Sequence, residues 1–164
     1  TAMLQIFATE GIDAIVSPGI AVESFAIMGV CIGAMLRIKE KEQRAMAAEF
    51  AMASIVAGTS EPCIYGICVR YKRPFLALIA GSAAGGLYLA ITGVYSGLTL
   101  VASNFFAVLF FTGASTGNFV NGVVGCLLGA AVAVVTTYFF GFDKNEPAIQ
   151  TDPSKQDVAL DEAE

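Results

Sequence analysis

The chain has 164 residues, of which 56% are hydrophobic and 14% are charged, and its mean hydropathy is +0.71. Residues 75–142 contain no Asp, Glu, Lys or Arg, which excludes an ordinary soluble domain. The net charge of −5 arises from the segment after Phe142, and the remaining part is neutral, so the charge does not indicate a nucleic-acid partner. We therefore expect an all-α polytopic membrane protein.

Cysteine and histidine usage argues against a metal site or a redox site. The sequence has four cysteines and no histidine, and no two cysteines show C-x-x-C spacing. We expect no metal and no cofactor, and we interpret the cysteines as reduced packing residues. The chain begins at Thr1 without a Met or a signal peptide, so we expect it to be a piece of a longer protein.

Three apolar segments are long enough to cross a bilayer. The first is residues 14–36, although Glu23 lies inside it, and the second is residues 75–95. The third is residues 120–142, which ends in an aromatic belt of the kind found at membrane interfaces. The charged residues 143–164 have little to bury, so we expect an acidic disordered tail or linker.

Two basic segments, residues 37–44 and 70–73, contain seven of the nine Lys and Arg residues and flank one apolar stretch. Short basic loops stay on the cytoplasmic side of a membrane. The stretch between them, about 25 residues long, must then enter the bilayer and return on the same side. Gly58 and Pro62 both break a helix, so the sequence predicts a re-entrant helical hairpin over about residues 45–69 that folds back at this point.

The fold-back point is polar. Thr59, Ser60 and Glu61 bring two hydroxyls and a carboxylate to membrane depth. Such groups are stable there only when they are buried in protein or line a watery cavity. We therefore predict a substrate-binding site near the bilayer midplane, formed by Glu61 at the tip together with Thr59, Ser60 and Tyr65.

A purely structural interpretation of the same residues stays open. Glu61 could simply open a helix, with Ser60 as the N-cap and Pro62 in the first turn. Glu23 and Glu49 are left outside the predicted site, because either could pair with a cation or lie at the interface.

The side of the membrane that the chain reaches after each crossing predicts a second hairpin. If residues 75–95 carry the chain outward and the tail is cytoplasmic, one crossing plus a hairpin from the opposite side must follow. We expect this second hairpin to turn near residues 113–118. Asn104, Asn118 and Asn121 could line it or bond across helices. Two opposed hairpins are typical of transporters with a midplane site.

The hairpin also carries a family motif. The motif Gly-Ile-Thr-Glu-Pro-Ala-Ile-Tyr-Gly, followed by a basic stretch ending in Pro-Phe, is matched at Gly58, Glu61, Pro62, Ile64, Tyr65, Gly66, Arg70, Lys72, Arg73, Pro74 and Phe75. The departures are Thr59, Ser60 and Cys63, and the second of these keeps a hydroxyl. The segment resembles the membrane-spanning IIC permease of the bacterial phosphoenolpyruvate-dependent sugar phosphotransferase system. It is most similar to the beta-glucoside and sucrose branch of the glucose superfamily.

This resemblance implies a function. Permeases of this family bind a sugar inside the bilayer and present its hydroxyl to a phosphocysteine on a cytoplasmic IIB domain. Residues 1–142 would be the C-terminal part of such a IIC domain in the bacterial inner membrane, with the lipid bilayer and the IIB and IIA domains as partners. A homodimer is also implied. Glu61 corresponds to the motif Glu, which binds sugar hydroxyls and is expected to help deprotonate the acceptor.

The same resemblance makes the chain part of a phosphohistidine-dependent sugar phosphotransferase that is inactive as an isolated fragment. The family's Gly-x-His-Trp stretch has no counterpart here, so its His is expected upstream of Thr1. Two alternatives remain open, an ion-coupled secondary sugar transporter and a membrane sugar sensor that transports nothing. Sugar phosphorylation that depends on phosphoenolpyruvate would separate the first interpretation from both.

Overall fold

A computed structural model describes residues 9, 11–97, 103–112 and 115–142. Within these ranges the regular secondary structure is helical, apart from one isolated antiparallel bridge between Asp13 and Ser96. The α-helices are α2 (Val16–Arg37), α3 (Lys41–Met52), the short α4 (Glu61–Cys63), α5 (Arg73–Thr92) and α6 (Thr116–Phe140). Two π-helical segments, η1 (Ala53–Ala57) and η2 (Ile64–Val69), and one 3-10 helix, η3 (Phe105–Phe111), complete the described part.

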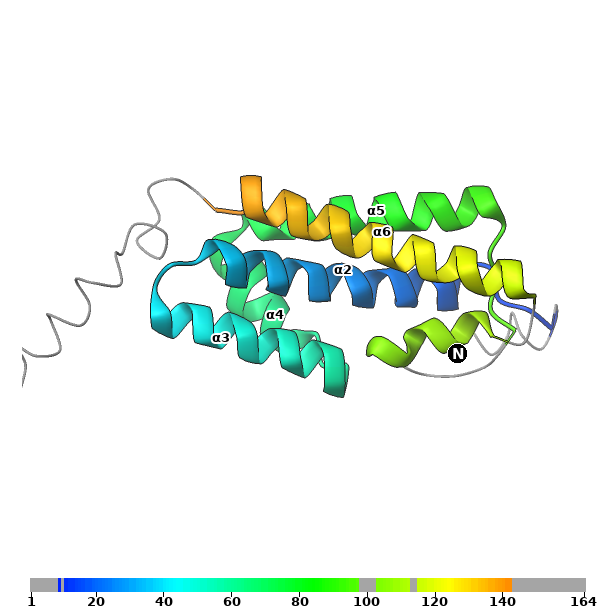
Figure 1. Ribbon diagram of the computed structural model, residues 1–164, viewed down its shortest axis with the longest axis horizontal. Coiled ribbons are helices and arrows are strands. Elements are labelled where there is room, and N and C mark those ends of the chain that lie inside the picture. The colour runs from blue at the N-terminus through cyan, green and yellow to red at the C-terminus, as the bar shows by residue number, and fades with distance from the viewer. Residues whose placement is uncertain (1–8, 10, 98–102, 113–114, 143–164) are drawn as a thin grey trace, which may run out of the picture.

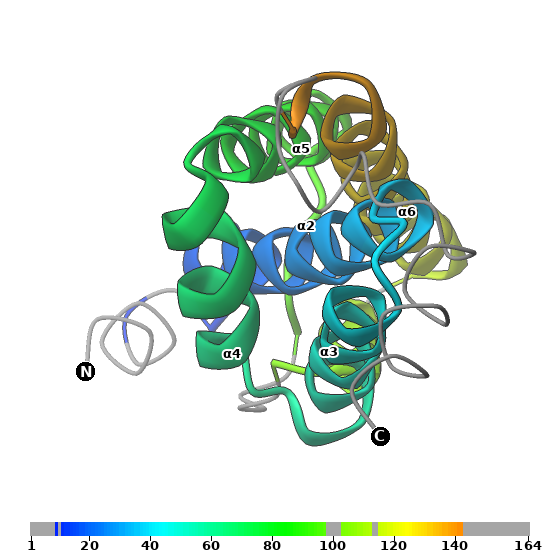
Figure 2. The same ribbon diagram turned by 90° about the vertical axis from the view of Figure 1, so that its left-hand side faces the viewer.

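Three of the described helices, α2, α5 and α6, are long and apolar enough to cross a membrane. They overlap the three ranges predicted as crossings, and the predicted all-α membrane architecture is confirmed. Helix α2 lies at the centre of the bundle, with α5 and α6 on one side and α3 and α4 on the other (Figures 1 and 2). Accordingly, 67% of the most apolar stretch of α2 is buried, against 28% in α5 and in α6.

Glycines allow the three long helices to approach one another closely. A Cβ atom on Gly29 of α2 would lie 2.4 Å from the carbonyl oxygen of Ala130 in α6. On α5, a Cβ atom on Gly85 would lie 2.7 Å from the carbonyl oxygen of Gly125. Small residues at such crossings are the usual basis of helix packing in membranes.

The segment between the two basic stretches folds back on itself. Helix α3 continues into η1, the chain turns at Gly58 with φ of +71°, and α4 continues into η2 in the opposite direction (Figure 1). The positive φ explains the glycine at this turn. Both ends of this helical hairpin lie at the end of the bundle where α2 ends and α5 begins, and its turn lies beside the middle of α2 (Figure 1).

The opposite end of the bundle is held by side chains that bond to the backbone. Asn118 at the start of α6 accepts from the Tyr95 backbone at 3.0 Å and donates to the carbonyl oxygens of Tyr95 at 2.8 Å and Phe111 at 3.2 Å. Asp13 and Ser96 exchange two backbone bonds of 3.1 and 2.7 Å. These contacts join the starts of α2 and α6 to the segment that follows α5.

The predicted second hairpin, with its turn near residues 113–118, is not confirmed. Residues 113 and 114 lie outside the described part, but Ser115 is the N-cap of α6, and its hydroxyl accepts from the Asn118 backbone at 3.2 Å. The polar stretch is therefore a helix-capping signal at the end of the bundle. The segment that reaches the middle of the bundle is η3, whose first residues meet the hairpin turn.

Candidate functional site

A small polar cavity of about 40 Å³, open on one side, lies where three segments meet. One wall is the middle of α2, another is the hairpin turn, and the third is Ser103, two residues before η3 begins. Its lining comprises Glu23, Ser24, Ile27, Ser54, Gly58, Ser60 and Ser103. Four hydroxyls and one carboxylate thus converge at about half the length of a helix that is long enough to span a bilayer.

The local structure explains how the hydroxyls are oriented. Ser24 donates to the carbonyl oxygen of Ile20 at 2.8 Å, and Ser54 donates to the carbonyl oxygen of Thr59 at 3.2 Å. A serine oxygen that donates its proton to the backbone keeps its lone pairs as acceptors. These two side chains can therefore accept hydrogen bonds from a ligand that carries hydroxyl groups.

The turn is held in place from both sides. The Thr59 backbone donates to the carbonyl oxygen of Ala53 at 3.3 Å, and the Asn104 side chain donates to the carbonyl oxygen of Val56 at 3.3 Å. A Cβ atom on Gly58 would lie 3.1 Å from the Asn104 backbone nitrogen. Glycine therefore suits this position both by its φ and by the closeness of η3. The π-helical segments on both arms are of a kind that often occurs at functional sites.

The structure separates the four residues predicted as the site. Ser60 lines the cavity. Thr59 and Glu61 are exposed and lie outside the described lining, and Tyr65 is 70% exposed on the same arm as Glu61. Ser60 stands at the N-cap position of α4, with Glu61 and Pro62 in its first turn, as the structural alternative assigned them, but the Ser60 side chain makes no capping hydrogen bond.

Sequence reasoning missed most of the lining. Glu23 was left outside the predicted site, yet it is the charged residue among those described as lining the cavity. Its signal was present in the sequence, since it is the one acidic residue in the apolar residues 14–36. Ser24 and Ser103 gave no comparable signal, because isolated serines are common in membrane helices and loops.

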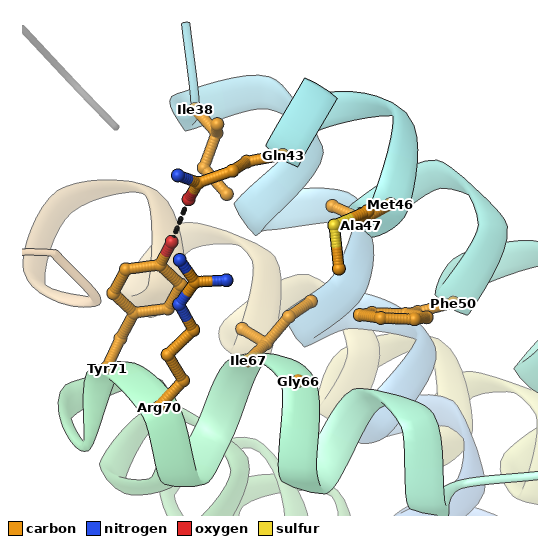
Figure 3. A pocket seen from close by; sticks show the side chains of 9 residues that line it. All are labelled: Ile38, Gln43, Met46, Ala47, Phe50, Gly66, Ile67, Arg70 and Tyr71. Atoms are coloured by element: carbon orange, nitrogen blue, oxygen red, sulfur yellow. Dashed lines mark hydrogen bonds between the residues drawn. The ribbon is translucent and has the colours of Figure 1, made fainter. Parts of the chain in front are cut away.

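A shallow hollow of about 10 Å³ lies at the base of the hairpin. Figure 3 shows the Phe50 ring lying over Gly66, and the Tyr71 hydroxyl donating to the Gln43 side chain across the two arms. The Arg70 guanidinium lies 5.4 Å from the centre of the Tyr71 ring. Because most of the lining is apolar and its polar groups bond to one another, we interpret this region as the closure of the hairpin.

Fold and cavity together define an all-α membrane protein with a hydroxyl-rich site at mid-bundle. The chain is similar to the PTS system beta-glucoside-specific EIIBCA component of Bacillus subtilis (strain 168), with 26% identity over 141 residues, or 86% of this chain and 22% of that protein. It is 29% identical over 159 residues to the PTS system beta-glucoside-specific EIIBCA component of Dickeya chrysanthemi, covering 93% of this chain and 24% of the relative. The chain is also 27% identical over 121 residues to the PTS system sucrose-specific EIIBC component of Bacillus subtilis (strain 168). That alignment covers 72% of this chain and 25% of the relative.

These relatives confirm the family resemblance predicted from the hairpin motif: over most of its length the chain is similar to beta-glucoside and sucrose components of the phosphotransferase system. The aligned part spans only 22 to 25% of the length of these three relatives. No family model matches the sequence, and no solved structure matches the fold.

Proposed function

We propose that the chain is the C-terminal part of a IIC sugar permease of the phosphotransferase system and that it binds a beta-glucoside or sucrose-like sugar in the mid-bundle cavity. The observation that carries this proposal is the cavity itself, in which four hydroxyls and a carboxylate from three segments surround the hairpin turn. The names of the relatives, beta-glucoside-specific and sucrose-specific, support the substrate class.

The chemistry of the lining fits a sugar. A sugar presents several hydroxyl groups, each of which donates one hydrogen bond, and an ionised carboxylate accepts such bonds without competing as a donor. A bond to a charged acceptor contributes about 1.5 to 3 kcal/mol. Glu23 supplies such an acceptor, and the serines supply groups that both donate and accept.

In this proposal the basic end of the bundle faces the cytoplasm across the bacterial inner membrane, and the hairpin enters the bilayer from that side. Residues 37–44 and 70–73 lie together at this end (Figure 1). The IIB domain would dock there, with IIA behind it, since the relatives are EIIBC and EIIBCA components. We also propose that the full-length protein is a homodimer.

Glu61 keeps a proposed role because of its place in the family motif. It opens α4 at the turn, next to Ser60, and its side chain is exposed and outside the described lining of the cavity. We propose that Glu61 contacts the sugar hydroxyl that receives the phosphoryl group, while the cavity holds the rest of the sugar. Thr59 and Tyr65 are exposed as well, and we propose that they also contact the part of the sugar that receives the phosphoryl group.

The experiment compares three substitutions in the full-length protein. Ser60→Leu places an apolar side chain in the cavity and removes a hydroxyl, so binding of a beta-glucoside should weaken at least about tenfold. Glu23→Ala, which removes the carboxylate, should weaken binding by a similar factor. Thr59→Leu makes the same kind of change at an exposed residue outside the described lining, so it should weaken binding less than Ser60→Leu does. Equal affinity in Ser60→Leu and the unmodified protein would refute the proposed site.

The same preparation separates the alternative functions. Phosphorylation of the bound sugar that requires phosphoenolpyruvate supports the permease, because neither an ion-coupled transporter nor a sensor would show it. Sugar accumulation that needs an ion gradient, without phosphorylation, would favour the transporter.

A further inference from the structure

The charges of this protein are separated along the bundle axis. Residues 14–36, 45–69 and 74–142 contain no Lys or Arg, and their acidic residues are Glu23, Glu49 and Glu61. The basic residues of the described part instead gather at one end, at Arg37, Lys39, Lys41, Arg44, Arg70, Lys72 and Arg73. Away from the basic end, these segments therefore carry only negative charges, all on exposed side chains, and the resulting negative field has no countercharge within them. The basic end offers a positive field.

Glu23 places this negative field in the cavity. It is the charged group among the described lining residues, and the other polar groups there are hydroxyls. Glu49 on α3 and Glu61 at the start of α4 both lie outside the described lining. Glu23 is exposed on α2, and a carboxylate there repels an anion that lies within a few ångströms of it.

We propose that Glu23 makes the cavity selective by charge, so that it binds uncharged sugars and rejects anionic ones such as uronates and sugar phosphates. This inference rests on the proposed sugar site and adds the feature that decides which sugars it accepts. An uncharged glucoside gains hydrogen bonds to Glu23, whereas an anionic sugar of the same shape meets a like charge with no Lys or Arg nearby to offset it.

A consequence concerns the product of a sugar phosphotransferase. A sugar phosphate carries about two negative charges at neutral pH. The carboxylate of Glu23 disfavours it in the cavity, and the basic residues attract it toward the end of the bundle. The same charge pattern that admits the uncharged substrate therefore favours release of the phosphorylated product toward the basic end.

The test measures binding to the full-length protein by calorimetry. The probes are methyl beta-glucoside, methyl beta-glucuronide, which replaces the CH₂OH group by a carboxylate, and glucoside 6-phosphate. The measured quantity is the ratio of glucoside affinity to the affinity of each anionic probe. Glu23→Gln should lower both ratios by about tenfold or more, even where absolute affinities change. Glu49→Gln is the matched control, and it should leave both ratios unchanged.

A second variant keeps the test independent of whether Glu23→Gln folds. Ser103 is exposed at the rim of the cavity, so Ser103→Lys adds a cation there without filling the core. It should also raise the relative affinity for the glucuronide. If the unmodified protein discriminates but neither variant changes the ratios, or if Glu49→Gln lowers them as much as Glu23→Gln does, the selectivity inference is wrong. Failure of the unmodified protein to bind methyl beta-glucoside would instead contradict the proposed sugar site.

Discussion

Asp13 is a fully buried carboxylate at the start of the central helix. It accepts hydrogen bonds from the backbone nitrogens of Ile15, Val16 and Ser17 at 2.8 to 2.9 Å and from the Ser17 hydroxyl at 2.7 Å. The first backbone nitrogens of a helix have no partner within it, and an anion is favoured there. Asp13 therefore fixes the point at which α2 begins.

The ionisation of Asp13 makes this contribution dependent on pH. Burial raises the pKa of Asp13, but the hydrogen bonds donated by Ile15, Ser17 and Val16 outweigh it, so the pKa lies below its ordinary value of 3.8. A carboxyl group with a lowered pKa stabilises the fold at pH above 3.8, and this stability is lost as the pH falls through the pKa of the folded protein.

Asp13→Ala should lower the free energy of unfolding by about 1 to 2 kcal/mol at neutral pH, because it removes the cap of α2. Thermal unfolding in detergent would measure the difference between the two proteins. The difference should stay constant from pH 8 to about pH 5 and narrow below the ordinary carboxyl pKa. A difference that widens on acidification would contradict the assigned role of the ionised carboxylate.

At the scale of helices and turns, the packing of α5 against its neighbours depends on adjacent glycines with different surroundings. A Cβ atom on Gly85 would lie 2.6 Å from Cγ1 of Val22 and 2.7 Å from the carbonyl oxygen of Gly125. A Cβ atom on Gly86 would meet nothing within 4 Å. The two positions therefore separate the effect of close helix approach from that of helix propensity.

Gly85→Ala should destabilise the protein by about 1 to 3 kcal/mol, the usual cost of overpacking a tight contact. Gly86→Ala should be neutral, or stabilising by up to about 1 kcal/mol, because alanine favours the helical backbone. The check is the unfolding midpoint of each variant in the same detergent. Equal effects of the two substitutions would show that α5 does not pack as described.

The sequence predicted those helices and turns whose signal lies in neighbouring residues. The three long helices follow from apolar segments of membrane-spanning length, and the fold-back at Gly58 follows from helix breakers between basic stretches. The second hairpin stays a prediction, because Ser115, within the polar stretch where its turn was expected, serves as the cap of α6. Most of the cavity lining was missed, since Ser60 lies at the predicted turn whereas Glu23 and Ser103 reach the cavity only through tertiary packing.

At the scale of the whole molecule, the central helix, the hairpin and η3 bring distant parts of the sequence to one point. Asn104 bonds to Val56 across 48 positions of sequence, and the cavity lies beside this contact. Its acidic and hydroxyl lining is far from the basic end, where Phe142 packs on Tyr71 with 4.9 Å between ring centres. This arrangement suits a protein that holds an uncharged polar ligand within a membrane and hands it on toward the basic end.

The central claim, that this cavity binds a sugar, is tested most directly by protection from chemical labelling. Ser103→Cys places a thiol at the rim of the cavity, whereas the four native cysteines of this chain are buried. In a full-length protein whose other accessible cysteines have been replaced, saturating beta-glucoside should slow alkylation of this thiol by about tenfold or more. A thiol at Gly86, which faces open space on α5, should react at an unchanged rate. If bound sugar leaves the alkylation rate at position 103 unchanged, the cavity is not the sugar site.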